Sequence, residues 1–138
     1  MTRIETPPSD GDLDFTYVIE SDFVRVTMGE TVDATIIGDA AEHLTNDPAY
    51  TERMNLLIDD RRNKVPIHPT EARKAAQLMT RYPGRFGPRF AFLVNSTVQY
   101  GMIRIFGALV QHQGLLVRPF RDEADAVAWL RESASPAQ

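Results

Sequence analysis

Three short apolar runs, each followed by a stretch with helical spacing, constrain the fold of this chain more than any other feature. Strands that are buried on both faces of a sheet are apolar throughout, and such sheets are built from parallel strands covered by helices. Right-handed helical crossovers join the strands. We therefore predict three consecutive strand–helix units. The apolar runs are residues 54–58, 90–94 and 115–120, and the helical stretches are residues 69 to about 82, 97–111 and 122–131.

Two β-branched and aromatic runs precede these units. They span residues 15–19 and 23–28 with a three-residue polar turn between them, which predicts an antiparallel hairpin. Thr31 is then predicted to cap a helix that ends before Pro48. The expected fold class is α/β, with a mixed sheet of about five strands and four helices, in which the antiparallel hairpin leads and parallel strands follow.

The length of 138 residues is that of one domain. Residues 1–12 and 133–138 are rich in small and polar residues and in proline, so we expect disordered tails on either side of a domain at residues 13–132. The chain has no cysteine, which indicates a reducing compartment and excludes thiolate catalysis. It shows neither a signal peptide nor an uncharged stretch long enough for a membrane span, so a cytoplasmic protein is expected.

Charge is distributed unevenly along the chain. Residues 1–52 contain 12 acidic and 2 basic residues, whereas residues 59–90 contain 3 acidic and 8 basic residues. A pattern of this kind is typical of a solvated, bipolar surface, and it is also compatible with a local site for an anion or an acidic protein. The overall charge of −4 and the lack of an aromatic stacking pattern disfavour nucleic acid as a partner.

The order of elements and several local stretches carry a family resemblance that covers residues 13–132. The stretches are Asn-Asp-Pro-Ala-Tyr at 46–50 leading to Met-Asn-Leu-Leu-Ile-Asp at 54–59, Tyr-Gly-Met at 100–102, and Val-Arg-Pro-Phe-Arg-Asp-Glu at 117–123 running to Ala-Trp-Leu at 128–130. On these stretches the chain resembles STAS domains of the type first known from anti-sigma-factor antagonists. It is more similar to small bacterial STAS-like proteins that are grouped with the CRAL-TRIO lipid-binding fold. The resemblance implies that the strands at 54–58 and 90–94 are neighbours.

One departure from this family concerns its regulatory serine. Antagonists that switch by phosphorylation carry Asp-Ser-Ser or Asp-Ser-Thr directly after the strand that corresponds to 54–58. This chain has Asp59-Asp60-Arg61-Arg62 there, and its next hydroxyl is Thr70. We therefore expect a module without the usual serine phospho-switch.

The strand ends are the expected place for a binding site, because ligands of open α/β sheets gather at the carboxyl ends of the strands. Basic side chains beside helix N-termini favour anions there. Three interpretations remain: a plain loop with helix caps, a rim that binds an anion or a partner, and catalysis, in that order of preference. The residues of the predicted rim are Asp59, Arg61, Arg62, Lys64, His68, Thr70, Ser96 and Thr97.

Two classes of function follow from these observations. The first is a non-catalytic regulatory or protein-interaction module of STAS type. The second, suggested by the lipid-binding relatives, is a binder of a small anionic or lipid ligand. In that case Tyr100, Met102 and Phe106 would line an apolar pocket, and Arg61 or Arg62 would hold the head group.

An enzyme is not expected, because no nucleophile, base and orienting group can be assembled from the sequence. His43, His68 and His112 lack metal-ligand spacing, so we expect no metal, and no cofactor is implied. Pro69 and Glu71 after His68 are typical of a helix start.

Two further expectations concern the surface. Trp129 lies one position away from the apolar stripe of the last helix, so it is expected to pack at its edge and stabilise the fold. The helix at 97–111 is predicted to turn Val98, Met102, Ile105, Phe106 and Leu109 inward. Its exposed flank would then contain Tyr100, Ile103 and Val110 and could support a homodimer.

Overall fold

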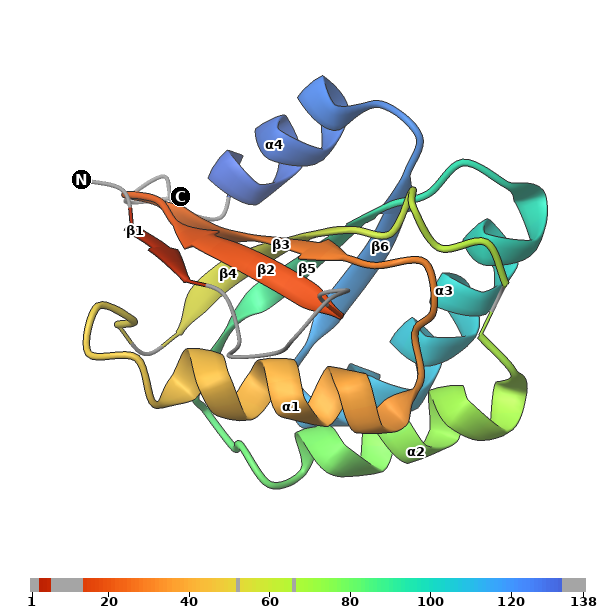
Figure 1. Cartoon of the computed structure of the whole chain (residues 1–138), viewed down its shortest axis with the longest axis horizontal. Coiled ribbons are helices and arrows are strands. Elements are labelled where there is room, and N and C mark those ends of the chain that lie inside the picture. Colours follow the sequence, from red (N-terminus) through yellow and green to blue (C-terminus); the bar gives the residue numbers. More distant parts are fainter. Residues whose placement is uncertain (1–2, 6–13, 52, 66, 133–138) are drawn as a thin grey trace.

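The computed structural model describes the backbone of residues 3–5 and all atoms of residues 14–51, 53–65 and 67–132. Within this part of the chain, six strands form one mixed sheet with four α-helices (Figure 1). The elements in chain order are β1 (Arg3–Glu5), β2 (Phe15–Ile19), β3 (Phe23–Met28), α1 (Ala34–Thr45), β4 (Met54–Asp59), α2 (Pro69–Met79), β5 (Phe86–Leu93), α3 (Thr97–Val110), a 3-10 turn (Gln111–Gln113), β6 (Leu116–Phe120) and α4 (Glu123–Glu132).

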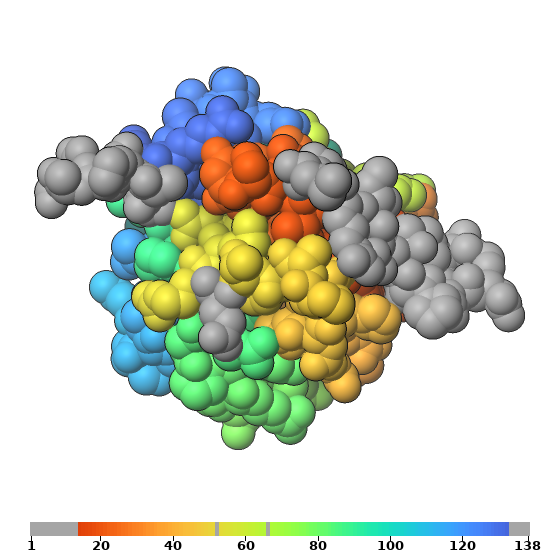
Figure 2. Space-filling view, turned by 90° about the vertical axis from the view of Figure 1, so that its left-hand side faces the viewer, coloured from red at the N-terminus to blue at the C-terminus, as the bar shows by residue number. Residues whose placement is uncertain are grey.

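The strands follow one another across the sheet in chain order. The β1–β2 and β2–β3 pairs are antiparallel, whereas β3, β4, β5 and β6 run parallel to one another. Because each right-handed crossover moves to the next strand in the same direction, α1, α2 and α3 all lie on one face of the sheet. The last helix, α4, covers the other face (Figure 1). Figure 2 shows the same layers from one side, with α4 in blue and the segment after α2 in green at opposite ends of the view.

Alternation along the strands divides the core between these two faces. In β4, Leu56 and Ile58 belong to the core under α1–α3, whereas Leu57 faces α4. In β5, Phe90 belongs to the first core and Ala91 to the second. This alternation is what a strand with period two requires when both of its faces are covered.

The fold class predicted from the sequence is confirmed: a leading antiparallel hairpin, parallel strands and four helices. The sheet gains one strand, because residues 3–5 pair with β2 inside the segment expected to be a tail. The other expected tail residues lie outside the described residues. The predicted cap of the first helix was wrong. Asp33, rather than Thr31, is the N-cap of α1, because its carboxylate accepts the Ile36 N–H at 2.9 Å.

The predicted inner face of α3 was also partly wrong. Met102 and Phe106 are buried, but Val98 and Ile105 are 58% and 45% exposed. The helix instead buries Gln99, Met102, Ile103, Phe106 and Val110. The predicted dimer flank is therefore corrected as well, since Ile103 and Val110 point into the protein.

Two glycines of α3 differ in their surroundings. A Cβ added to Gly107 would lie 3.2 Å from the Cβ and the carbonyl oxygen of Val117 in β6. Gly107 thus permits the close approach of α3 to the sheet. Gly101 has open space around it and is exposed.

Candidate functional site

The loop after β4 and the start of α3 form a polar rim at the carboxyl ends of the parallel strands. We use this name for residues 59–64 and 95–99. β4 pairs directly with β5, as the family resemblance implied. The Asn95 amide donates to the Arg61 carbonyl at 3.0 Å, and the Gln99 amide donates to the Asp60 carbonyl at 2.9 Å. The rim is therefore one connected unit.

Arg61 is occupied by acidic neighbours rather than free for an anion. Its Nε and Nη2 donate to the two carboxylate oxygens of Asp59 at 2.9 and 2.7 Å, and Nη2 also lies 3.4 Å from Glu123 Oε1. Partial burial raises the pKa of Asp59, but the hydrogen bonds from Arg61 outweigh that effect and hold the pKa below its ordinary value. The positive charge of Arg61 is thus neutralised by carboxylates of the protein itself.

The other predicted rim residues have different surroundings. Arg62 is exposed and forms no ion pair within the described part of the chain, and Lys64 Nζ lies 3.6 Å from Glu30 Oε2. Both line a shallow hollow with Ser96 and Gln99. Ser96 is the N-cap of α3 and accepts the Gln99 N–H at 3.1 Å.

Four predicted residues do not line this hollow: Asp59, which is paired with Arg61, and His68, Thr70 and Thr97. His68 is the N-cap of α2, where its Nδ1 accepts the Thr70 N–H at 3.1 Å. The Thr97 hydroxyl lies 3.4 Å from Arg121 Nη2. His68 is thus a helix cap, and Thr70 lies in the first turn of α2, where its N–H is the group that His68 caps.

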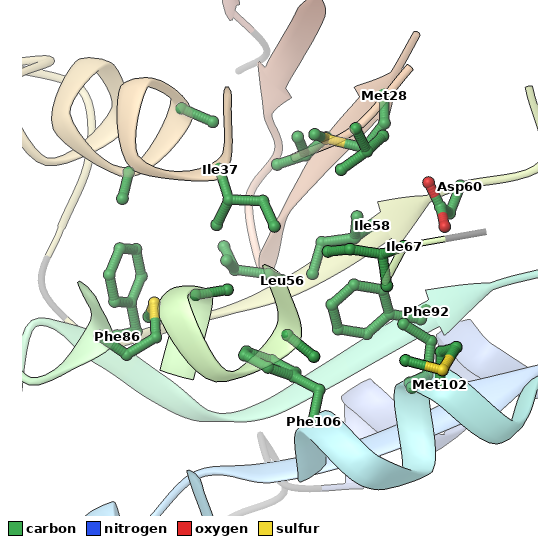
Figure 3. Close-up of a pocket in the computed structure, with 18 of the residues that line it drawn as sticks. Met28, Ile37, Leu56, Ile58, Asp60, Ile67, Phe86, Phe92, Met102 and Phe106 are labelled. Carbon is green, nitrogen blue, oxygen red and sulfur yellow. The ribbon is translucent and has the colours of Figure 1, made fainter. Parts of the chain in front are cut away.

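A second site lies inside the protein, between the sheet and helices α1–α3 (Figure 3). It is an apolar cavity of about 100 Å³. Its walls are side chains of β3, β4 and β5, of the three helices and of the segments next to them. They are Val26, Met28, Val32, Ile37, Ala40, Ala41, Leu44, Leu56, Ile58, Asp60, Ile67, Ala72, Ala75, Met79, Phe86, Phe92, Met102, Ile103 and Phe106. All of these except Asp60 are apolar.

Asp60 is the one charged group in this wall. It lies at one end of the cavity, near Met28, Ile58 and Ile67 (Figure 3). Its side chain is buried, with the residue 7% exposed, and its Oδ1 has no hydrogen-bond partner within the described part of the chain. Burial raises the pKa of Asp60 from 3.8 to about 6; a hydrogen bond with Asn63 opposes the rise, and the Asp59 charge adds to it.

The cavity corrects the predicted pocket in part. Met102 and Phe106 line it, but Tyr100 does not; its ring faces the Arg121 guanidinium at 5.5 Å. Arg61 and Arg62, which were expected to hold a head group, do not line the cavity, and its one charged group is Asp60. The sequence does contain a signal for Asp60, because two aspartates follow the buried strand. Adjacent side chains of a strand point to opposite faces, so one of the two aspartates is expected to face the core.

The three histidines lie in different elements of the fold. His43 packs on Phe15 with ring centroids 5.7 Å apart, His68 caps α2, and His112 lies exposed in the 3-10 turn. Asp60 has no titratable hydroxyl, thiol or imidazole among the other residues that line the cavity.

None of the described helices combines the length and the apolar character needed to cross a membrane.

No protein-family model matches the sequence, and no curated protein matches it significantly. The fold is similar to the crystal structure of an uncharacterized protein of the DUF3478 family with a SpoIIAA-like fold, from Shewanella loihica PV-4. The TM-score is 0.57 at 15% sequence identity, over 94% of this chain and 93% of the other. The chain thus has a SpoIIAA-like, or STAS-like, fold.

Proposed function

We propose that this protein is a non-catalytic binding module that takes a small apolar molecule into the cavity between β3–β5 and helices α1–α3. The observation that carries this proposal is the composition of the cavity wall, which is apolar apart from Asp60. Apolar cavities of this order of size stay dry and bind molecules such as benzene. An empty cavity of about 100 Å³ costs on the order of 2 kcal/mol of stability. A ligand that fills it would offset that cost.

Three methionines provide a direct test. Met28, Met79 and Met102 line the cavity, whereas Met54 does not. Titration with toluene should move the methyl NMR signals of these three residues in a saturable way and leave that of Met54 in place. The proposal is wrong if no signal moves, or if all of them drift together without saturation.

A matched pair of variants shows where the toluene binds. Ala40 lines the cavity from α1 and is half-buried, so Ala40→Leu should reduce the space and weaken toluene binding. Ala128 is exposed on α4, so Ala128→Leu adds the same atoms elsewhere and should leave binding unchanged. Equal effects of the two substitutions would place the bound toluene outside the cavity.

A second candidate is a protein-interaction module, in keeping with the STAS-type fold. The observation that favours it is the outer face of α3, where Val98 and Ile105 lie two helical turns apart and are both exposed. Apolar side chains that face water on one side of a helix are a common feature of contact surfaces. The partner that we propose for this surface is a second copy of the chain.

Sedimentation velocity over a range of concentrations tests this candidate. If two copies associate through this face, Ile105→Glu should shift the protein toward monomer, and Thr51→Glu, at an exposed position away from α3, should not. A wild type that is monomeric at every concentration rules out self-association through α3.

A further inference from the structure

One oxygen of the Asp60 carboxyl group, Oδ1, is an acceptor without a donor. It is buried and has no hydrogen-bond partner among the described residues, and the other groups that line the cavity are apolar. A buried acceptor that has lost water and gained no donor is unfavourable. A ligand that brings a donor to this oxygen would remove the defect, whereas a pure hydrocarbon would leave it.

The backbone holds this carboxyl group at the cavity. The Asp60 N–H donates to the Leu93 carbonyl at 2.9 Å, and the Asp60 carbonyl accepts from the Gln99 amide at 2.9 Å. The same amide lies 3.4 Å from the Asn63 carbonyl. With β5 and α3 both attached to this residue, its side chain is fixed at the end of the cavity rather than swinging out to solvent.

No basic side chain in the described part of the chain compensates Asp60. Arg61, its neighbour in the chain, is paired with Asp59 and Glu123, and the cavity wall contains no lysine, arginine or histidine. The charged group acting on Asp60 is Asp59, which has the same sign. A cationic group on the ligand would therefore meet an uncompensated carboxylate.

Building on the proposed function, we propose that the cavity selects small apolar molecules that end in a cationic amine, and that Asp60 binds the amine. An ammonium group brings donors and the opposite charge, and charge-assisted hydrogen bonds are stronger than neutral ones. An alcohol brings one donor without the charge. A carboxylate ligand, such as a fatty acid, would place two like charges together. The order of preference is therefore amine, alcohol, hydrocarbon and carboxylate.

Four ligands with the same aromatic body test this order at neutral pH: benzylamine, benzyl alcohol, toluene and benzoate. The dissociation constants come from the methyl signals of the methionines that line the cavity. Benzylamine should bind wild type more tightly than toluene by about tenfold or more, the effect of a hydrogen bond to a charged group. Benzoate should bind least.

Asp60→Asn keeps the shape of the side chain and removes its charge. In this variant toluene should bind as in wild type, and the advantage of benzylamine should disappear. Asp60→Leu is a second variant with the same expectation. Arg62→Ala, on the exposed rim, is the control that should change neither affinity.

The outcomes separate this inference from the proposed function. If toluene binds in the cavity but benzylamine has no advantage, or keeps it in both Asp60 variants, the cavity binds ligands and the role of Asp60 is wrong. If none of the four ligands moves the methionine signals saturably, the proposed function fails and this inference fails with it.

Discussion

The two faces of the sheet are filled to different degrees. Under α4, Leu57, Ala91, Leu93, Ala126 and Leu130 are at most 1% exposed and pack in one cluster. Under α1–α3 the cluster is larger, but it surrounds a cavity with a buried carboxylate at its end. A single helix can pack against β4–β6 without leaving a cavity. Three helices that pack against one another as well as against the sheet leave a space between them and the sheet. We infer that the α4 face chiefly stabilises the fold and that the α1–α3 face gives up some stability for binding.

The largest expected effect is on the α4 face. Trp129 is 8% exposed, its ring lies 5.6 Å from that of Phe120, and the Arg89 guanidinium lies 4.9 Å from the centre of its ring. Trp129→Ala should lower the free energy of unfolding by about 3–5 kcal/mol, as for other buried aromatic truncations. Urea denaturation measures this change. Unchanged stability would show that Trp129 is a contact residue rather than part of the core.

The next effect is a pH dependence that belongs to the cavity face. The pKa of Asp60 is raised from 3.8 in its ordinary state to about 6 in the folded protein. Folding is therefore favoured by this group below about pH 4, and that contribution is lost as the pH rises through about 6. Relative to Asp60→Asn, wild type should lose about 3 kcal/mol at most over this range.

Urea unfolding of both proteins at a series of pH values gives this difference. The low pKa of Asp59 acts in the opposite direction, since its contribution is lost as the pH falls; it is present in both proteins and largely cancels. A difference that stays constant with pH would show that Asp60 is solvated in the folded state.

A matched pair in β4 compares the two faces directly. Leu57 is fully buried against α4, and Ile58, the next residue, lines the cavity. Leu57→Ala should cost about 1 kcal/mol more than Ile58→Ala, because cost rises with the cavity that a truncation creates in close-packed surroundings. Toluene should restore more stability to Ile58→Ala, where it also fills the space that the truncation adds, than to Leu57→Ala, where it fills only the existing cavity. Equal costs and equal responses would mean that the faces are packed alike.

The smallest expected effect concerns the polar rim. Phosphate should raise the melting temperature through Arg61, Arg62 and Lys64 only slightly, because Asp59, Glu123 and Glu30 already lie beside two of these cations. Replacing both Arg61 and Arg62 with alanine should abolish that rise and change unliganded stability by about 0.5 kcal/mol or less. Equal shifts in wild type and variant would indicate a general salt effect, and the rim would then be only a loop with helix caps.

Much of the element order was predictable from local patterns. The continuous apolar character of residues 54–58 and 90–94 indicated strands buried on both faces, and both are central strands. Pro69 and Glu71 marked the start of α2 correctly. These signals work because strand burial and helix capping depend on residues close together in the chain.

The face of α3 was not predictable in this way. An apolar stripe through Val98 and Ile105 is as regular as the one that the helix buries. The choice is made by Gln99, a polar residue that is 4% exposed. Its amide satisfies the Asp60 carbonyl, and its Oε1 accepts the Asn95 N–H at 3.0 Å. A buried polar side chain is tolerated where such partners exist, and one of them, the Asp60 carbonyl, comes from another part of the chain.

The sequence by itself determined the strand–helix order, the parallel sheet and the place of the strand ends, since periodicity and caps are local properties. Only the tertiary structure decided which of two adjacent aspartates would be neutralised. Asp59 pairs at the surface with Arg61, which also lies beside Glu123, whereas Asp60, one residue later, faces the cavity without a donor for its Oδ1 among the described residues. Successive side chains at the end of a strand point in opposite directions, and the apolar surroundings of Asp60 come from β3, β5 and helices α1–α3, which pack together only in the folded protein.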